Sequence, residues 1–280
     1  MIMSEEISRK LITTYRKRLW SPFTKAIRDY ALIQENDKVA VCISGGKDSF
    51  LAAILLRELQ QHGPIPFELK YLCLDPGYDE KSLTLIKKNA ERLDLKLEFF
   101  SATIFRYVET LKERPCYLCA RMRRGNLYHA AETLGCNKIV LGHHYDDVIE
   151  TILMNLMYAG KYRTMLPKIQ SKNFKGMSLI RPLYLIEEKD IQNFWQKQGF
   201  EFIHCACTLS EKEGMEESSK RLAVKKFIAK ESKTNPYLKA NIFNSAQKVN
   251  LETVISYQDA SGVHQQYDPE SPHFVSKDED

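Results

Sequence analysis

CISGGKDSF, residues 42–50, joins an apolar segment to a turn that contains two glycines. The nucleotide-binding loop of P-loop kinases and GTPases has four residues between its glycines and a Lys directly before a hydroxyl residue. Here the glycines are adjacent, and Asp48 separates Lys47 from Ser49. The stretch therefore predicts a strand-to-helix turn of another kind, and its ligand has to be inferred from the residues themselves.

Apolar strand patterns and amphipathic helix patterns alternate along the chain around this turn. Strands are predicted at 38–44, 67–75, 96–102 and 137–142, and helices at 48–63, 80–95, 125–135 and 146–160, after a helical segment at 8–33. Strands separated by helices of this length predict an α/β fold with an open parallel sheet and helices on both faces. Ligands of such sheets bind beyond the carboxyl ends of the strands, near the switch in strand order. We therefore expect SGGKDS (44–49) and GHHYDD (142–147) to share one edge of the sheet.

The composition of the turn indicates an anion site. Gly45 and Gly46 lack Cβ atoms where backbone amides must face inward, and the helix that follows directs its N-terminal N–H groups at the turn. Ser44 and Ser49 add hydroxyl donors and Lys47 adds a positive charge, a set that suits pyrophosphate. The alternative is a plain Gly-Gly turn in which Asp48 or Ser49 only caps the helix.

The distribution of charge along the chain indicates the kind of partner that the protein binds. The chain of 280 residues has a formal net charge of +5, although residues 261–280 hold five acids and one Lys. The first 30 residues hold seven bases against three acids, and RMRRG (121–125) is a second basic segment, a pattern that suits a polyanionic partner. We expect three parts: a basic helical N-terminal arm at 1–35, a catalytic domain at 36–250 and an acidic, flexible tail at 251–280.

No stretch has the roughly 18–20 consecutive apolar residues of a membrane span, and the N-terminus lacks the apolar core of a signal peptide. We therefore expect a cytoplasmic protein without a membrane partner. Its seven cysteines are more consistent with metal ligation or burial than with disulfides. Three of them lie in or beside predicted strands and are expected to be buried small hydrophobes, namely Cys42, Cys73 and Cys136.

The turn SGGKDS after a strand resembles the PP-loop of the ATP pyrophosphatases, which split ATP between its α- and β-phosphates. Three further segments, 116–135, 141–160 and 179–191, resemble in order and spacing those of the tRNA 2-thiocytidine synthetases, the TtcA family. The likeness runs from about residue 20 to about residue 250. It implies an adenine nucleotide alpha-hydrolase-like fold and a tRNA sulfurtransferase. Such an enzyme uses ATP and Mg²⁺ to adenylate the C2 oxygen of a cytidine in the anticodon loop, at position 32, before sulfur replaces that oxygen.

The cysteines outside the strands form two pairs. Cys116 and Cys119 make a C-x-x-C at the start of a helical segment, and Cys205 and Cys207 follow as HCAC. Four such thiols can make a tetrahedral zinc site. The resemblance implies instead a 4Fe–4S cluster with three thiolate ligands and one iron open to sulfide. The distal pair of the family is C-x-x-C, one residue longer than here, so the third ligand is Cys207 or Cys205; alignment from the C-terminal side favours Cys207.

The remaining site residues follow from the same edge of the sheet. The expected ATP-binding set is Ser44, Gly45, Gly46, Lys47, Asp48, Ser49, Asp75, Gly142 and Asp146, and the expected catalytic set is Asp48, Lys47 and Asp147. Either Asp146 or Asp147 can orient Mg²⁺, a cation that prefers carboxylates, while the other caps the helix. His143 and His144 are either structural or catalytic. Asp75 either faces the nucleotide or shapes the turn before Pro76.

The expected partners are tRNA and a source of sulfur, either a cysteine desulfurase or sulfide, and a homodimer is left open. Arg121, Arg123 and Arg124 would contact RNA phosphates, or else form a solvated helix face. Two other functions remain open. One is a PP-loop ligase that forms an amide or a lysidine and carries zinc in the cysteine site. The other is a tRNA-binding module without chemistry, against which the intact SGGKDS argues.

Overall fold

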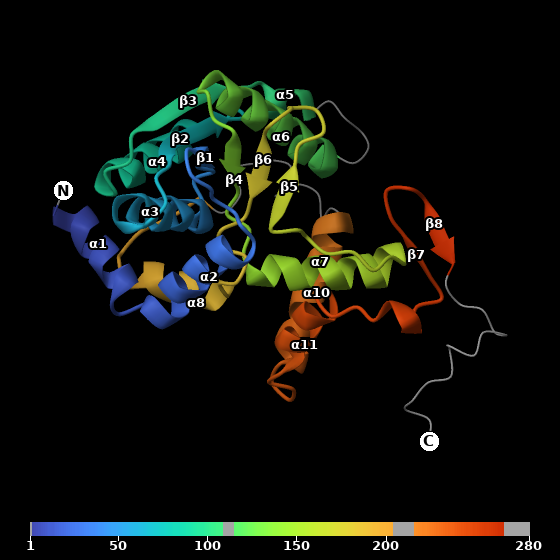
Figure 1. The fold of residues 1–280 in the computed structure, drawn as a ribbon. Coiled ribbons are helices and arrows are strands. Elements are labelled where there is room, and N and C mark those ends of the chain that lie inside the picture. The colour runs from blue at the N-terminus through green and yellow to red at the C-terminus, as the bar shows by residue number, and fades with distance from the viewer. Residues whose placement is uncertain (1, 109–114, 204–215, 266–280) are drawn as a thin grey trace.

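A six-stranded sheet forms the centre of the molecule in the computed structural model, which describes residues 2–108, 115–203 and 216–265 (Figure 1). The strand order is β3-β2-β1-β4-β6-β5. Neighbouring strands are parallel except β5, which pairs antiparallel with β6 at the edge. The strands are β1 (Lys38–Cys42), β2 (Glu68–Asp75), β3 (Leu97–Ser101), β4 (Lys138–Val140), β5 (Lys168–Gln170) and β6 (Ser178–Ile180). The predicted parallel sheet is confirmed, and two strands that the sequence patterns did not indicate extend it: the parallel strand β6 and the antiparallel edge strand β5.

Helices cover both faces of this sheet. They are α1 (Ile2–Ile12), α2 (Ser21–Asp29), α3 (Lys47–His62), α4 (Glu80–Arg92), α5 (Ile104–Val108), α6 (Pro115–Thr133), α7 (Tyr145–Ala159), α8 (Glu188–Gln196), α10 (Glu216–Glu231) and α11 (Leu238–Ser245). Along β1, Val39 and Val41 belong to the core under α3 and α8, whereas Ala40 and Cys42 belong to the core under α6. This division follows from the two-residue repeat of a strand, whose successive side chains point to opposite faces.

The strand order reverses between β1 and β4. From β1 the chain builds β2 and then β3 on one side of the sheet, and the later strands β4, β6 and β5 lie on the other side. The turns that leave the carboxyl ends of β1 and β4 therefore meet at the switch point, where ligands of doubly wound sheets bind. These turns are the two segments singled out in the sequence, SGGKDS and GHHYDD.

The predicted N-terminal arm, residues 1–35, packs against the sheet domain. Leu11, Leu19 and Phe23 are fully buried and belong to the same core as β1 and α3. A π-helical turn, η1 (Arg16–Trp20), connects α1 to α2, and its basic side chains are exposed. At the other end, the part of the predicted tail that is described forms a hairpin of β7 (Ser256–Gln258) and β8 (Val263–Gln265) after a 3₁₀ turn, η2 (Leu251–Thr253). Residues 266–280 lie outside the described residues.

None of the described helices has the length and apolar content that a membrane span requires.

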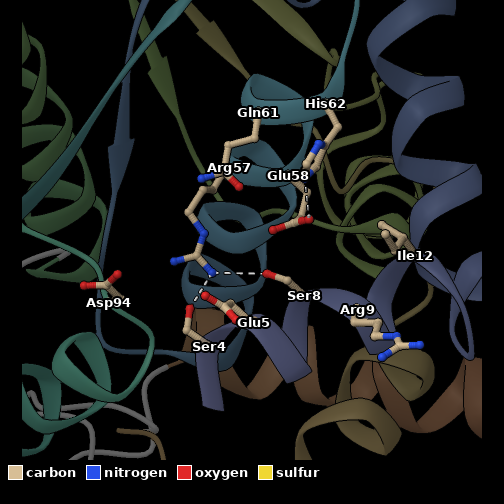
Figure 2. Close-up of a pocket in the computed structure, with 10 residues that line it drawn as sticks. All are labelled: Ser4, Glu5, Ser8, Arg9, Ile12, Arg57, Glu58, Gln61, His62 and Asp94. Atoms are coloured by element: carbon tan, nitrogen blue, oxygen red, sulfur yellow. Dashed lines mark hydrogen bonds and ion pairs between the residues drawn. The ribbon is translucent and has the colours of Figure 1, made fainter. Parts of the chain in front are cut away.

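A polar cavity of about 340 Å³ lies between α1 and α3, and Figure 2 shows the side chains around it. The Arg57 guanidinium reaches across it, donating to Ser4 Oγ at 2.8 Å and to Ser8 Oγ at 3.2 Å, and it also donates to the carbonyl of Leu93 after α4. Ser4 and Ser8 are buried, and so is Glu58, which lies 3.9 Å from His62. Arg57 thus ties the N-terminal helix to the sheet domain.

Replacing Arg57 by Met should destabilise the protein, because it leaves the buried hydroxyls of Ser4 and Ser8 without their donor. Loss of such hydrogen bonds costs about 1–3 kcal/mol of the free energy of unfolding. Urea denaturation followed by circular dichroism measures the change. Arg9→Met is the matched control, since Arg9 lines the same cavity but is exposed, and it should change stability by less than about 0.5 kcal/mol. Equal effects of the two substitutions would contradict the assignment.

Candidate active site

The turn after β1 is built around Gly45. Its backbone has φ +81°, a conformation that L side chains rarely adopt. A Cβ on Gly45 would also lie 2.5 Å from Ile203 Cδ1 and 2.8 Å from Ile86 Cγ1. Gly46, by contrast, has an ordinary extended backbone as the N-cap of α3. Within this structure the requirement for glycine is therefore strict at residue 45.

Side-chain hydrogen bonds fix the rest of this turn. Ser49 Oγ donates to the carbonyl of Gly46 at 2.8 Å and accepts from the backbone N–H of Ser44 at 3.2 Å. The indole N–H of Trp195, on α8, donates to the carbonyl of Lys47 at 2.9 Å. The first turn of α3 is thus held from inside the loop and from a helix about 150 residues further along the chain.

The second turn, which follows β4, packs directly on the first. A Cβ added to Gly142 would lie 3.0 Å from both the carbonyl carbon of Asp48 and the nitrogen of Ser49. These are backbone atoms, so a larger residue could be accommodated only by a shift of the loop. The absence of a side chain at Gly142 allows the SGGKDS and GHHYDD turns to come together.

A cavity of about 390 Å³ opens between the two turns and α6. The predicted site residues that line it are Ser44, Asp48, Ser49, Gly142 and Asp147. The other lining residues are Cys42, Ile43, Leu74, Tyr78, Ala120, Arg123, Arg124, Leu127, Leu141 and His143. The predicted meeting of the two segments at one edge is therefore observed, and the RMRR segment contributes two of its arginines to the same space.

Asp48 has the properties of a ligand for a cation in this cavity. Its Oδ1 atom is buried and has no hydrogen-bond partner among the described residues, while Oδ2 lies 3.1 Å from the Lys47 ammonium. Burial raises the pKa of Asp48, against the opposing effects of Lys47 and His144. A buried carboxylate oxygen without a partner is costly, and a bound Mg²⁺ would satisfy it.

The two acids of the second turn have different environments. Asp147 faces the cavity, and its Oδ2 accepts the backbone N–H of His144 at 3.0 Å, so it also caps α7. Asp146 is buried behind the turn, where Oδ1 lies 2.7 Å from the Lys239 ammonium and Oδ2 accepts the backbone N–H of Glu188 at 2.7 Å. Asp147, and not Asp146, is placed with Asp48.

The two histidines of this turn are both largely enclosed. His143 lines the cavity, its Nδ1 is buried without a partner among the described residues, and burial lowers its pKa to about 4. His144 is buried at the N-terminus of α7, where its Nδ1 lies 3.5 Å from Asp147 Oδ2. His143 is therefore neutral at pH 7 and positioned to contact a ligand, whereas His144 supports Asp147.

Asp75 lies at the neighbouring strand end. Its Oδ1 accepts the backbone N–H groups of Gly77 at 2.8 Å and Tyr78 at 2.7 Å, which closes the turn after β2. Its side chain lines a separate cavity with Ser101 and Asn126. The turn-shaping role that the sequence left open is observed, and the nucleotide contact of Asp75 stays a prediction.

Two of the predicted cysteine ligands belong to α6, the helix whose Ala120, Arg123 and Arg124 line this cavity. Cys119 is buried on α6 against Leu74 and Phe105, one turn after Cys116 on the same helix, and the adjacent Ala120 lines the cavity. The predicted ligands Cys205 and Cys207 lie outside the described residues. Ile203 is the last described residue before them, and its N–H donates to the carbonyl of Gly45 at 3.3 Å. Within the described ranges, no cluster of three or more metal-ligating side chains is present.

The strand cysteines are buried, as predicted. Burial raises the pKa of Cys42 and Cys73 to about 12 and that of Cys136 to about 11. Thiols with such values stay protonated at neutral pH and are poor metal ligands or nucleophiles.

The sequence analysis did not predict several charged residues near the site, because they belong to helices that are distant in the chain. Glu188 of α8 lies 3.1 Å from the Lys47 ammonium. On α10, Lys225 lies 2.7 Å from Glu188, and Arg221 lies 3.1 Å from Glu150 of α7. The i, i+4 spacing of Arg221 and Lys225 indicates one basic helix face, but nothing in the sequence indicates which acids that face contacts.

Comparisons with known proteins agree with this geometry. A family model described as the PP-loop domain matches residues 14–210. A tRNA-cytidine(32) 2-sulfurtransferase of Shewanella pealeana is 36% identical over 276 residues, covering 96% of this chain and 87% of that protein. A protein of the same name from Alkalilimnicola ehrlichii is 39% identical over 243 residues, covering 85% and 75%. One from Pelobacter propionicus is 32% identical over 246 residues, covering 86% and 89%.

Among solved structures, the U34-tRNA thiolase NcsA from Methanococcus maripaludis, described with its 4Fe–4S cluster, superposes with a TM-score of 0.64. It is 22% identical, and the match covers 84% of this chain and 78% of that one, which confirms the fold. The relatives named above match over at least three quarters of their own length, and the family model spans most of the chain. The chain therefore belongs to the PP-loop family of tRNA-cytidine(32) 2-sulfurtransferases.

Proposed function

We propose that this protein is an ATP-dependent tRNA thiolase, which adenylates the C2 oxygen of cytidine 32 in the anticodon loop and replaces that oxygen with sulfur. The observation that carries the proposal is the packing of the SGGKDS and GHHYDD turns around one cavity, in a chain of this family. A tRNA-modifying role would place the protein in the cytoplasm. Sulfur would come from a cysteine desulfurase or from sulfide, and a homodimer is compatible with this role.

The first half of the reaction would use the PP-loop. Residues 44–49 would hold the β- and γ-phosphates of ATP through backbone N–H groups, the two Ser hydroxyls and the Lys47 ammonium. Asp48 and Asp147 would hold Mg²⁺, which supplies neutralisation of charge on the phosphates. The cytidine O2 attacks the α-phosphorus, the bond from that phosphorus to the bridging oxygen breaks, and pyrophosphate leaves.

Adenylation is needed because a pyrimidine carbonyl oxygen is a poor leaving group, whereas AMP is a good one. Sulfide attack on C2 would then break the bond to the activated oxygen and release AMP. The cavity must therefore admit a base that has left its stack, as enzymes acting on nucleobases require. Arg123 and Arg124 line this cavity and would meet RNA phosphates beside it.

The cysteine residues fit an iron–sulfur ligand set. Cys116 and Cys119 lie one helical turn apart on α6, and Ile203, the last described residue before Cys205 and Cys207, donates its N–H to the carbonyl of Gly45 in the PP-loop. Cys116, Cys119 and Cys207 would hold a 4Fe–4S cluster, with Cys205 as the alternative third ligand. When bound, such a cluster supplies an iron without a protein ligand, to which sulfide can bind.

Asp48→Ala should abolish ATP-dependent thiolation, because it removes the buried carboxylate opposite Asp147. A loss of at least about 100-fold in pyrophosphate release with tRNA is expected, with iron content unchanged. Asp79→Asn is the matched control, since Asp79 also lies at a helix N-terminus but outside this cavity, and Asn retains the cap. Full pyrophosphate release by Asp48→Ala would refute the assignment.

Gly142→Ala should weaken nucleotide binding by roughly tenfold, because the new Cβ presses on the backbone of Asp48 and Ser49. Calorimetric titration with a non-hydrolysable ATP analogue measures this change. Gly125→Ala is the control: Gly125 is exposed on α6, nothing lies within 4 Å of a Cβ built there, and nucleotide affinity should stay at the wild-type value. Wild-type affinity in Gly142→Ala would show that the loop contact does not matter.

Metal and acid-labile sulfide content, measured on protein purified without oxygen, identifies the cysteine ligands. We expect four irons per chain in the wild type and loss of most iron in Cys116→Ala, Cys119→Ala and Cys207→Ala, because each removes one of three protein ligands. Cys205→Ala and the buried control Cys136→Ala should keep their iron. One zinc per chain, no sulfide and comparable losses in all four site variants would favour a PP-loop ligase instead.

A further inference from the structure

Two cationic side chains of helix α10 form ion pairs with acidic residues at the active site. Arg221 Nη1 lies 3.1 Å from Glu150 Oε2 and 3.4 Å from Asp147 Oδ1. One turn later, Lys225 Nζ lies 2.7 Å from Oε2 of Glu188. The other carboxylate oxygen of Glu188, Oε1, lies 3.1 Å from the Lys47 ammonium. The carboxylates that border the phosphate site are thus paired with cations from outside the PP-loop.

These pairs are electrostatically coupled to the site. Burial raises the pKa of Glu150, and Arg221 opposes that effect. Burial also acts to raise the pKa of Glu188, but hydrogen bonds and charges from Lys225 and Lys47 hold it at about 2. Each of these carboxylates is therefore paired with a cation of α10 that favours its ionised form.

Each carboxylate oxygen of Asp147 has a hydrogen-bond partner. One oxygen accepts the backbone N–H of His144, and the other is the one near Arg221. A metal ion that binds Asp147 in the cavity must share or take over one of these oxygens. The contact between Arg221 and Asp147 is long, and the side chain of Arg221 is 45% exposed. This contact is therefore the weaker of the two and the one that a metal ion would replace.

Apolar packing holds α10 in place independently of Arg221. Val224 and Ile228 are buried in a cluster with Val148, Ile149 and Ile152 of α7. The guanidinium can therefore exchange its partner while the helix stays docked, and its removal should leave the fold intact.

We propose that Arg221 is a positioning residue for Asp147. It holds the carboxylate in the metal-free protein and gives it up to Mg²⁺ when the nucleotide complex binds, while its charge continues to attract the phosphates. The inference rests on the proposed function, in which Asp147 is a magnesium ligand. It implies two opposite effects of removing the charge: less competition for a bare metal ion, and weaker attraction for the anionic metal–ATP complex.

The test uses the full-length protein with Arg221→Met, Arg221→Lys and Lys226→Met, the last an exposed lysine on the same helix. Binding of Mn²⁺ without nucleotide is measured from the free-Mn²⁺ electron paramagnetic resonance signal. Binding of α,β-methylene-ATP with Mg²⁺ is measured by calorimetry. For Arg221→Met we expect about two- to fivefold tighter Mn²⁺ binding and about two- to fivefold weaker nucleotide binding, as for a partly exposed charge. Arg221→Lys and Lys226→Met should stay near the wild type in both.

If Arg221 had only a structural role, Arg221→Met would weaken the binding of Mn²⁺ and of the nucleotide together. Parallel losses in the two affinities, or no change in either, therefore overturn the inference. Asp147→Asn separates this failure from that of the proposed function. If Asp147→Asn weakens Mn²⁺ binding and Arg221→Met has no effect, only the positioning role is lost. If Asp147→Asn leaves Mn²⁺ binding unchanged, the magnesium assignment fails, and the role of Arg221 fails with it.

Discussion

The contact between Gly142 and the backbone of Asp48 and Ser49 is the constraint on which the rest of the site depends. Strands β1 and β4 are parallel neighbours, so the turns that follow them leave the sheet at the same edge. Parallel neighbours would still be separated by their side chains if residue 142 carried a Cβ. The missing side chain brings the carboxylates of Asp48 and Asp147 to one cavity, which is the requirement for binding a metal–nucleotide complex.

Concentrating acids around a phosphate site creates an electrostatic problem. Asp146, Asp147 and Glu150 lie on α7 and Glu187 and Glu188 at the start of α8, and unpaired acids near a polyanion would repel it. In the structure, cations of the two C-terminal helices pair with them: Arg221 with Asp147 and Glu150, Lys225 with Glu188, and Lys239 with Asp146 and Glu187. The C-terminal helices are therefore part of the electrostatics of the site as well as of the fold.

The PP-loop also connects the nucleotide site to the cysteine segments. Gly45 packs under Ile203 and accepts its N–H, and Cys119 is buried beside the part of α6 that lines the cavity. Adenylation acts on the C2 oxygen, and sulfur transfer acts on the C2 carbon to which that oxygen is bound. The two steps therefore require the nucleotide site and the source of sulfur to be close in space.

Short-range patterns in the sequence were sufficient for much of the fold. The predicted strand at 38–44 matches β1 with two extra residues at its end, and the predicted helix at 48–63 matches α3 to within one residue at each end. Burial on both faces and helical periodicity are local signals, which is why the sequence was sufficient here. The short strands β5 and β6 were not predicted. A strand of three residues is too short to show an alternating apolar pattern. The helical start at the cysteine pair was expected, and α6 begins at Pro115.

The site divides in the same way. Residue types and spacing in SGGKDS and GHHYDD predicted an anion site and a cation site at strand ends, since these preferences belong to each short segment. Only the tertiary structure decided that Asp147 faces the cavity while Asp146 turns away to Lys239, and that Asp75 closes its own turn. It also decided that Arg221 and Lys225 reach the acids of α7 and α8. The physical reason is that ion pairing depends on distances of a few ångströms between helices that are far apart in the chain, and no local pattern encodes those distances.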